Sequence, residues 1–152
     1  SAGVILHMIP EAGVLAGISH PGVMIISDAG EIVNGAGHPR STGTFARTLG
    51  VYVREKHAVS LMDALGKMTL LPARRMEGVA PMMRHKGRVQ VGADADLTLF
   101  DPDKVKDLAT FRKPAEPSTG IPYVIVAGQL VVDHGTIVTT AYPGKGVIGN
   151  TH

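Results

Sequence analysis

The strongest constraint on the fold is an apolar run without alternation, Val23–Ile26, behind a helix-like segment. Strands buried on both faces, as in parallel sheets, have this pattern, whereas half-exposed strands alternate. A similar run, Val4–Met8, comes earlier. The segment between the two runs, Glu11–Ile18, is helix-like, because it follows Pro10 and carries an acidic residue in its first turn, where the helix dipole favours a negative charge. The order predicts two parallel strands joined by a helix through a right-handed crossover.

Further helices are predicted before residue 83. Thr44–Glu55 has apolar residues on one helical face, namely Phe45, Leu49 and Tyr52. Ser60 and Asp63 resemble a capping box, and an apolar stripe follows them: Leu61, Ala64, Leu65 and Met68. Pro72 suits the first position of a short helix that covers Ala73–Met76. We interpret the Met and Leu stripes as core packing.

Past residue 83 the pattern becomes that of short strands. Leu97–Phe100 follows a Gly-Ala-Asp turn, and a looser, proline-bearing segment covers Ala109–Pro122. Residues 123–138 read as a hairpin with Ala127-Gly128 at its turn, with a third strand after Asp133-His134-Gly135. Neither the helical nor the β-rich part forms a complete architecture, because one strand–helix–strand unit cannot close a barrel and a few hairpin strands leave open edges.

Composition limits the function classes. Only 18% of the 152 residues are charged, against about 25% in a typical soluble domain, so we expect more protein to cover part of the surface, although ordinary scatter remains an alternative. The absence of cysteine excludes disulfides, thiolate metal sites and a cysteine nucleophile, and it fits the cytoplasm. No apolar run reaches the ~20 residues of a membrane span, and no signal-peptide pattern precedes the opening apolar run, which begins as a fragment would.

Nucleic-acid binding has little support. The net charge is +2, and the chain has three Phe, three Tyr and no Trp for base stacking. The densest basic run, Arg84–Arg88, is typical of a solvated loop. We therefore expect no nucleic-acid partner and no membrane partner, and a basic nucleic-acid binder remains the weakest hypothesis.

Asp28 falls just past the carboxyl end of the second predicted strand, followed by a glycine-rich loop and then His38-Pro39-Arg40. Catalytic groups collect at this end of the strands in α/β barrels and open parallel sheets. An aspartate at such a position also serves as a turn former or helix cap. The position alone leaves both interpretations open.

Two motifs extend this observation. They are His38-Pro39-Arg40-x-x-Gly43-Thr44-Phe45-x-Arg47-x-Leu49-Gly50 and Gly87-x-x-x-x-Gly92-Ala93-Asp94-Ala95-Asp96. Together they resemble the C-terminal part of an amidohydrolase-superfamily enzyme, and they are most similar to the D-aminoacylase, or N-acyl-D-amino-acid deacylase, family. The similarity runs from about residue 4 to about residue 137.

The resemblance implies a fold of class α/β plus β. Residues 1–82 would supply the last strands and helices of a metal-dependent (β/α)8 barrel, and residues 83–152 the C-terminal part of a small β-sandwich. Ile5–Met8 would lie close to the seventh barrel strand, and Val23–Ser27 would form the eighth. The missing N-terminal barrel segment would be the partner of this chain.

The resemblance also implies a mechanism, hydrolysis of the amide bond of N-acyl-D-amino acids. Asp28 would be the general base, because a carboxylate beside a metal stays ionised yet reaches the hydrolytic water. Arg40 would bind the substrate α-carboxylate through two parallel hydrogen bonds. His38 is a second candidate for substrate binding, and we expect it to orient the loop rather than to ligate directly.

The cofactor implied is zinc, or another divalent metal, held mostly by residues outside this chain, with Asp28 as its one contact here. The chain has seven histidines but no His-x-His or His-Glu-x-x-His spacing. It also has Ala29 where the family has glycine after the aspartate, and we expect that Cβ to crowd the loop. We expect the isolated chain to be inactive and to self-associate through apolar surface. The alternative is a non-catalytic relic or interaction module of the same fold.

Overall fold

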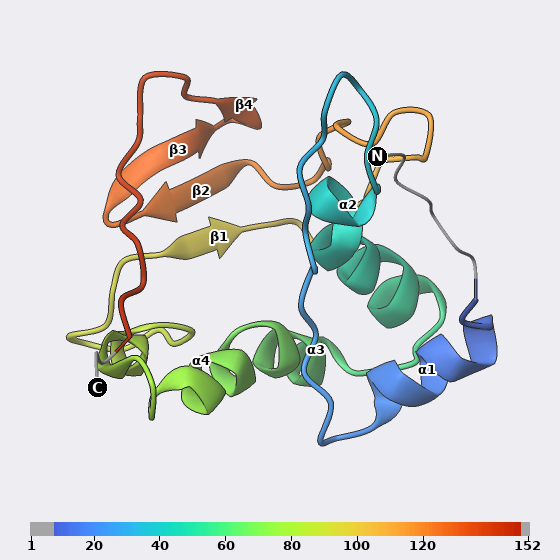
Figure 1. Ribbon diagram of the computed structural model, residues 1–152, viewed down its shortest axis with the longest axis horizontal. Helices are drawn as coiled ribbons and strands as arrows, with labels where there is room; N and C mark the ends of the chain where they lie inside the picture. The colour runs from blue at the N-terminus through green and yellow to red at the C-terminus, as the bar shows by residue number, and fades with distance from the viewer. Residues whose placement is uncertain (1–7, 150–152) are drawn as a thin grey trace.

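The computed structural model describes residues 8–149, which form helices followed by one small sheet (Figure 1). The helical elements are α1 (Glu11–Ser19), α2 (Arg40–Arg47), the π-helix η1 (Thr48–Glu55), α3 (Leu61–Met68), α4 (Leu70–Met76) and the 3₁₀ helix η2 (Pro81–His85). The strands are β1 (Leu97–Leu99), β2 (Tyr123–Val126), β3 (Gln129–Asp133) and β4 (Thr136–Ile137). No helix among residues 8–149 is long and apolar enough to cross a membrane.

The predicted helices form, and two of them begin earlier than predicted. α1 begins at Glu11, as predicted. α2 begins at Arg40, four residues before the predicted Thr44, because Pro39 already has helical backbone angles and its carbonyl accepts the amide of Gly43 at 2.9 Å. α4 begins at Leu70, so Pro72 is its third residue and not its first. The missing amide of Pro72 costs nothing there, since first-turn amides have no partner within a helix.

The sheet confirms the predicted hairpin. β2 and β3 pair as antiparallel strands around Ala127-Gly128, and β4 adds to β3 after Gly135. The turn residues Ala127 and Gly128 have φ of 47° and 80°, the positive pair that a two-residue hairpin loop needs to match the twist of its strands. β1 pairs with β2, which makes the order β1-β2-β3-β4.

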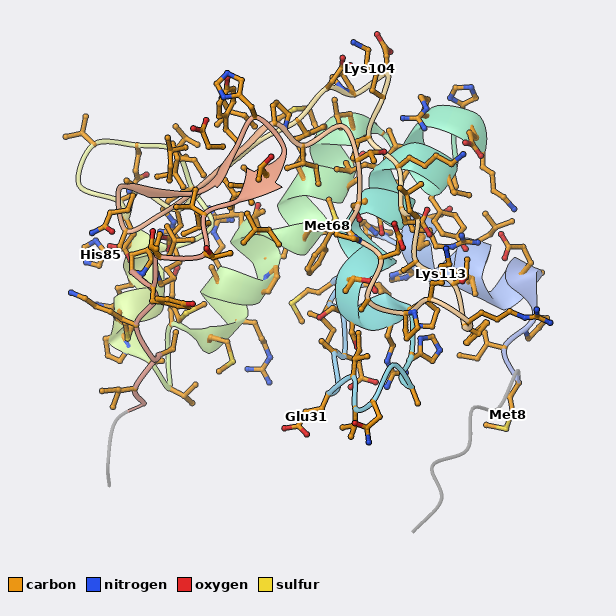
Figure 2. The ribbon with its side chains drawn as sticks, turned by 90° about the horizontal axis from the view of Figure 1, so that it is seen from above. Met8, Glu31, Met68, His85, Lys104 and Lys113 are labelled. Atoms are coloured by element: carbon orange, nitrogen blue, oxygen red, sulfur yellow. The ribbon has the colours of Figure 1, made fainter. Side chains whose placement is uncertain are left out.

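The core joins the helices to the segment between β1 and β2. Ala46, Leu49 and Val105 are buried together, and apolar side chains from both parts of the chain pack on them: Val53, Leu61, Leu65, Met68, Phe100 and Ile121. Figure 2 shows Met68 between the α3 ribbon and the α2–η1 ribbon. The stripe predicted for α3 is therefore core packing, as expected.

The buried face predicted for the helix at Thr44–Glu55 is partly wrong. Leu49 and Tyr52 are buried, but Phe45 is 46% exposed. α2 turns a face of small residues inward instead, since Gly43 and Ala46 are buried. A Cβ on Gly43 would stand only 3.2 Å from that of Asp107, so close packing against the segment around Asp107 decides which face points in.

The strand predicted at Val23–Ser27 does not form. Figure 1 draws this segment as a coil between α1 and α2, and residues 4–7 of the expected preceding strand lie outside the described residues. Only Ile25 is buried, and its amide donates to the carbonyl of Lys67 at 3.0 Å. A parallel strand needs a neighbouring strand for its backbone groups, and within residues 8–149 the segment meets the end of α3 in place of one.

A buried lysine attaches this segment to α3. Lys67 is only 4% exposed, and its Nζ donates to the carbonyl oxygens of Ile18, at 2.7 Å, and of His20. These carbonyls lie at the C-terminal end of α1, where a cation also meets the negative end of the helix dipole. Lys67 thereby sets where the chain leaves α1 and leads toward Asp28.

Candidate functional site

Asp28 lies at the exposed end of the coil, with its backbone in the left-handed region. Its φ is 48°, a conformation that a residue with a Cβ adopts at a cost. The side chain is 75% exposed, and its Oδ2 forms an ion pair with Nη2 of Arg40 at 2.7 Å. Within residues 8–149, Oδ1 has no hydrogen-bond partner. The carboxylate is therefore held by one oxygen and offers the other to a ligand or a water.

Arg40, the first residue of α2, reaches the backbone of Asp28 as well. Its Nε donates to the Asp28 carbonyl oxygen at 2.8 Å, beside the ion pair made by Nη2. A guanidinium has five N–H donors, and these two contacts use one edge of it. The remaining donors, on a side chain that is 44% exposed, can bind an anion next to Asp28.

Sequence reasoning missed Ser41. Its Oγ accepts from the amide of Gly30 at 3.2 Å and donates to the carbonyl of the same residue at 3.0 Å. Arg40 and Ser41 thus hold the backbone on both sides of Ala29. The sequence contained a signal for this role. Ser41 directly follows Arg40, and a serine hydroxyl at that position can bond to groups outside the helix. Ala29 is exposed, so the structure does not show its methyl group crowding the described part of the loop.

His38 stands at the start of α2. Its Nδ1 accepts from the amide of Arg40 at 3.1 Å, and its ring meets that of Phe111 edge-on, with centroids 5.2 Å apart. The imidazole therefore satisfies a first-turn amide that the helix cannot satisfy itself. The structure brings Asp28, His38 and Arg40 together around one helix N-terminus.

An open hollow of about 380 Å³ lies beside this group, lined in part by His38, Arg40 and Phe111. Two further charges line it, Arg47 and Asp107, whose Nη1 and Oδ2 are 3.4 Å apart. Burial acts to lower the pKa of Arg47, but Asp107 and Tyr52 together raise it by more, so the net shift of that pKa is upward. The hollow is thus lined by two cations, Arg40 and Arg47, and by one carboxylate, Asp107.

The described residues do not make a metal centre by themselves. No three His, Cys, Asp or Glu side chains gather into a possible metal site in residues 8–149. Asp28 is one exposed carboxylate, whereas a catalytic zinc takes about three protein ligands. Asp28 alone therefore does not make a zinc site within residues 8–149.

The second motif, Gly87–Asp96, contacts the sheet at its hairpin turn. Oδ1 of Asp96 accepts the amide of Ala127 at 2.8 Å, in the β2–β3 turn, and Lys86 contacts both Asp96 and Asp94, at 2.5 Å and 2.9 Å. The Ala127 amide and then Lys86 lower the pKa of Asp96, while Asp96 and then Asp94 raise the pKa of Lys86. The motif therefore attaches the hairpin turn to the segment behind η2.

Curated relatives match most of this chain. An N-acyl-D-glutamate deacylase of Alcaligenes xylosoxydans xylosoxydans is 43% identical over 131 residues, which cover 86% of this chain and 25% of the relative. A D-aminoacylase of the same organism is 42% identical over 130 residues, 86% of this chain and 26% of that protein. The chain thus spans about a quarter of the length of the relatives it matches.

Solved structures match the fold. A D-aminoacylase crystal structure superposes with a TM-score of 0.77 at 38% identity, over 87% of this chain and 27% of that one. An N-acyl-D-glutamate deacylase from Bordetella bronchiseptica, complexed with zinc and a phosphonate inhibitor, superposes with a TM-score of 0.71 at 39% identity, over 81% of this chain and 25% of that one. The described residues therefore have the fold of the corresponding part of these enzymes.

The resemblance predicted from the two motifs is confirmed by a family model. A model described as the amidohydrolase family matches residues 23–132, a range that contains Asp28, both motifs and all of the hairpin except Asp133. With relatives near 40% identity and a common fold, these findings agree, and the chain belongs to the amidohydrolase family.

Proposed function

We propose that this chain supplies the general base and an anion-binding arginine to an enzyme that hydrolyses the amide bond of N-acyl-D-amino acids. The observation that carries the proposal is the Asp28–Arg40 pair, with Oδ2 and Nη2 2.7 Å apart and both side chains open to solvent. The pair lies in a segment about 40% identical to N-acyl-D-amino-acid deacylases.

The proposal includes an architecture. The segment Val23–Ser27 would become the eighth strand of a (β/α)8 barrel once the other strands flank it, and residues 83–152 would complete a small β-sandwich. Three apolar side chains of the segment Val23–Ser27 are exposed, namely Val23, Met24 and Ile26. They support the strand assignment, because a barrel strand is covered on both faces. Asp28 would then stand at the carboxyl end of that strand, where barrel enzymes hold their catalytic groups.

Asp28 would act through its open oxygen. Oδ1 accepts a proton from the attacking water while the water oxygen bonds to the amide carbon; the same carboxyl group then returns the proton to the nitrogen as the carbon–nitrogen bond breaks and the amine leaves. Arg40 holds the other oxygen and points its remaining donors at the α-carboxylate of the substrate. His38 accepts the Arg40 amide and thereby holds the first turn of α2, with Arg40, in place.

The zinc of such a site would be held by other parts of the enzyme, since the described residues offer it one carboxylate. Zinc lowers the pKa of a bound water and polarises a carbonyl oxygen. One solved neighbour contains zinc, and another is described as having a binuclear metal centre. We accordingly expect the isolated chain to bind zinc weakly and to be inactive, with its apolar surface available for self-association.

A chimera tests the proposal. This chain replaces the aligned quarter of the Alcaligenes N-acyl-D-glutamate deacylase, and hydrolysis of N-acetyl-D-glutamate and zinc content are measured. Asp28→Asn keeps the shape of the side chain but removes the base, so kcat should fall by about 10²–10⁴ while zinc is retained. Asp103→Asn, the same change at another exposed aspartate, is the control and should leave kcat within about twofold.

Two results would contradict the proposal. Near wild-type kcat in Asp28→Asn would show that Asp28 is not the base. A folded, zinc-containing chimera without activity would favour a non-catalytic interaction module.

A further inference from the structure

The backbone at Asp28 is held in an unfavourable conformation. Its φ of 48° lies in the left-handed region, which residues with a Cβ avoid unless the surrounding structure holds them there. The loop that follows is exposed from residue 28 to residue 31 and again from 33 to 36, and Figure 2 shows Glu31 on it pointing away from the helices. Something other than burial must therefore fix the direction of the Asp28 side chain.

Two consecutive residues of α2 provide that restraint. Arg40 contacts Asp28 at its carbonyl oxygen and at Oδ2. Ser41 bonds both backbone groups of Gly30, as acceptor from the amide at 3.2 Å and as donor to the carbonyl at 3.0 Å. These contacts fall on both sides of Ala29. Gly30 has nothing within 4 Å of the place where a Cβ would stand, so packing does not restrain it.

The hydroxyls of Thr44 and Thr48 behave differently, whereas that of Thr42 also bonds outside α2, to the Pro114 carbonyl at 2.7 Å. Thr44 Oγ1 donates to the Arg40 carbonyl at 2.9 Å, and Thr48 Oγ1 donates to the Thr44 carbonyl at 2.9 Å, both four residues back within the helix. Ser41 bonds instead to a residue eleven positions earlier. Its hydroxyl thus contributes to the loop and not to its own helix.

We infer that Ser41 is a positioning residue for Asp28: its hydroxyl fixes the Gly30 backbone and thereby keeps the Asp28 carboxylate in the direction that catalysis needs. This inference rests on the proposed function, because it takes Asp28 as the base. A long, half-exposed arginine restrains one side of the turn, and the short serine, with a single χ angle, restrains the other. Without the hydroxyl, glycine has the backbone freedom to let the turn open.

The test is a double-mutant cycle in the same chimera. Ser41→Ala should lower kcat about tenfold, leave KM within about threefold and leave the zinc content unchanged. In the Asp28→Asn background the same substitution should change kcat by less than twofold, because it has no base left to misplace. Ser41→Thr keeps the hydroxyl and should restore at least half of the wild-type kcat.

Ser118→Ala is the matched control. Ser118 is half-buried like Ser41, and its Oγ also donates to a carbonyl of the α2 region, that of Thr42, at 3.2 Å. It does not touch the loop at 28–30, so its loss should leave kcat within twofold.

Different results overturn different claims. An equal loss of kcat from Ser41→Ala in both backgrounds, or no loss beside an intact Asp28, overturns the positioning role while the base assignment stands. If Asp28→Asn itself leaves kcat unchanged, the proposed function fails and the positioning role fails with it.

Discussion

Of two segments predicted as strands from their apolar residues, the hairpin forms strands and the run at Val23–Ser27 does not. The hairpin at Tyr123–Val126 and Gln129–Asp133 pairs with itself around Ala127-Gly128. The run at Val23–Ser27 is at least as apolar but is a coil, with one backbone hydrogen bond from Ile25 to α3. The difference is in where each segment finds its partner.

A hairpin strand has its partner two residues away, so the turn alone brings the hydrogen-bonding groups together. A parallel strand depends on strands that are distant in sequence, because a crossover must separate them. The apolar composition of a segment predicts that the segment will be buried. It does not supply the neighbour against which the segment is buried.

The two regions also differ in what their polar groups do. Around the hairpin, Asp96 and Lys86 are engaged in contacts within the protein. Beside the coil, Asp28 has an oxygen and Arg40 has donors without a partner within residues 8–149. The contacts of the hairpin and the proposed chemistry of the coil therefore lie in separate regions, and each can be disrupted separately.

The largest effect should come from the packing side, at Gly120. Its φ is +77°, and an added Cβ would lie 2.5 Å from the amide nitrogen of Val105 in the core. Gly120→Ala should destabilise the chain by about 2–5 kcal/mol, the sum of about 1–2 for left-handed backbone and about 1–3 for overpacking. Urea unfolding followed by circular dichroism measures this change.

Gly135→Ala is its control. Gly135 has nearly the same φ, +78°, with nothing within 4 Å of an added Cβ, so only the backbone cost of about 1–2 kcal/mol should remain. Equal losses at the two glycines would show that the contact with Val105 is not tight.

Next in size is an effect on the chemical side, at Arg40. Arg40→Lys preserves the charge but loses the two-pronged geometry, so KM in the chimera should rise about tenfold for substrates with a free α-carboxylate, which corresponds to about 1.4 kcal/mol. The matching amides should show little change. Equal losses on both substrate classes would mean that Arg40 acts only by holding Asp28.

The smallest effect should be electrostatic, at Asp96. Asp96→Asn keeps an acceptor for the Ala127 amide but removes the charge opposite Lys86, and should cost about 0.5–1 kcal/mol at pH 7. The pKa of Asp96 is lowered by folding, so its contribution is present above the unfolded value of about 3.9 and is lost as the pH falls through the folded value. Lys86, with its pKa raised, stays charged across this range.

Urea unfolding of wild type and Asp96→Asn at pH 7 and at pH 3 checks the sign, and the difference between the proteins should shrink at pH 3. Asp94→Asn is the matched control, because Asp94 also contacts Lys86 but accepts no hydrogen bond from Ala127. A larger loss at Asp94 than at Asp96 would contradict the assigned network.

The sequence by itself determined the features that depend on near neighbours. Three features follow from residues a few positions apart: the cap at Ser60, the hairpin turn and the apolar stripe of α3. In the cap, Ser60 Oγ accepts the Asp63 amide at 3.1 Å. The motif around His38-Pro39-Arg40 also indicated the family, because such a motif is a set of residue types at fixed spacings along the chain.

Only the tertiary structure decided the rest. Phe45 turned outward because Gly43 packs against a segment more than sixty residues away. The salt bridge from Arg40 to Asp28 and the bonds from Ser41 to Gly30 cross eleven or twelve residues of loop, and no local pattern specifies such contacts. They exist because Lys67 and Pro39 set the directions in which the chain enters and leaves that loop.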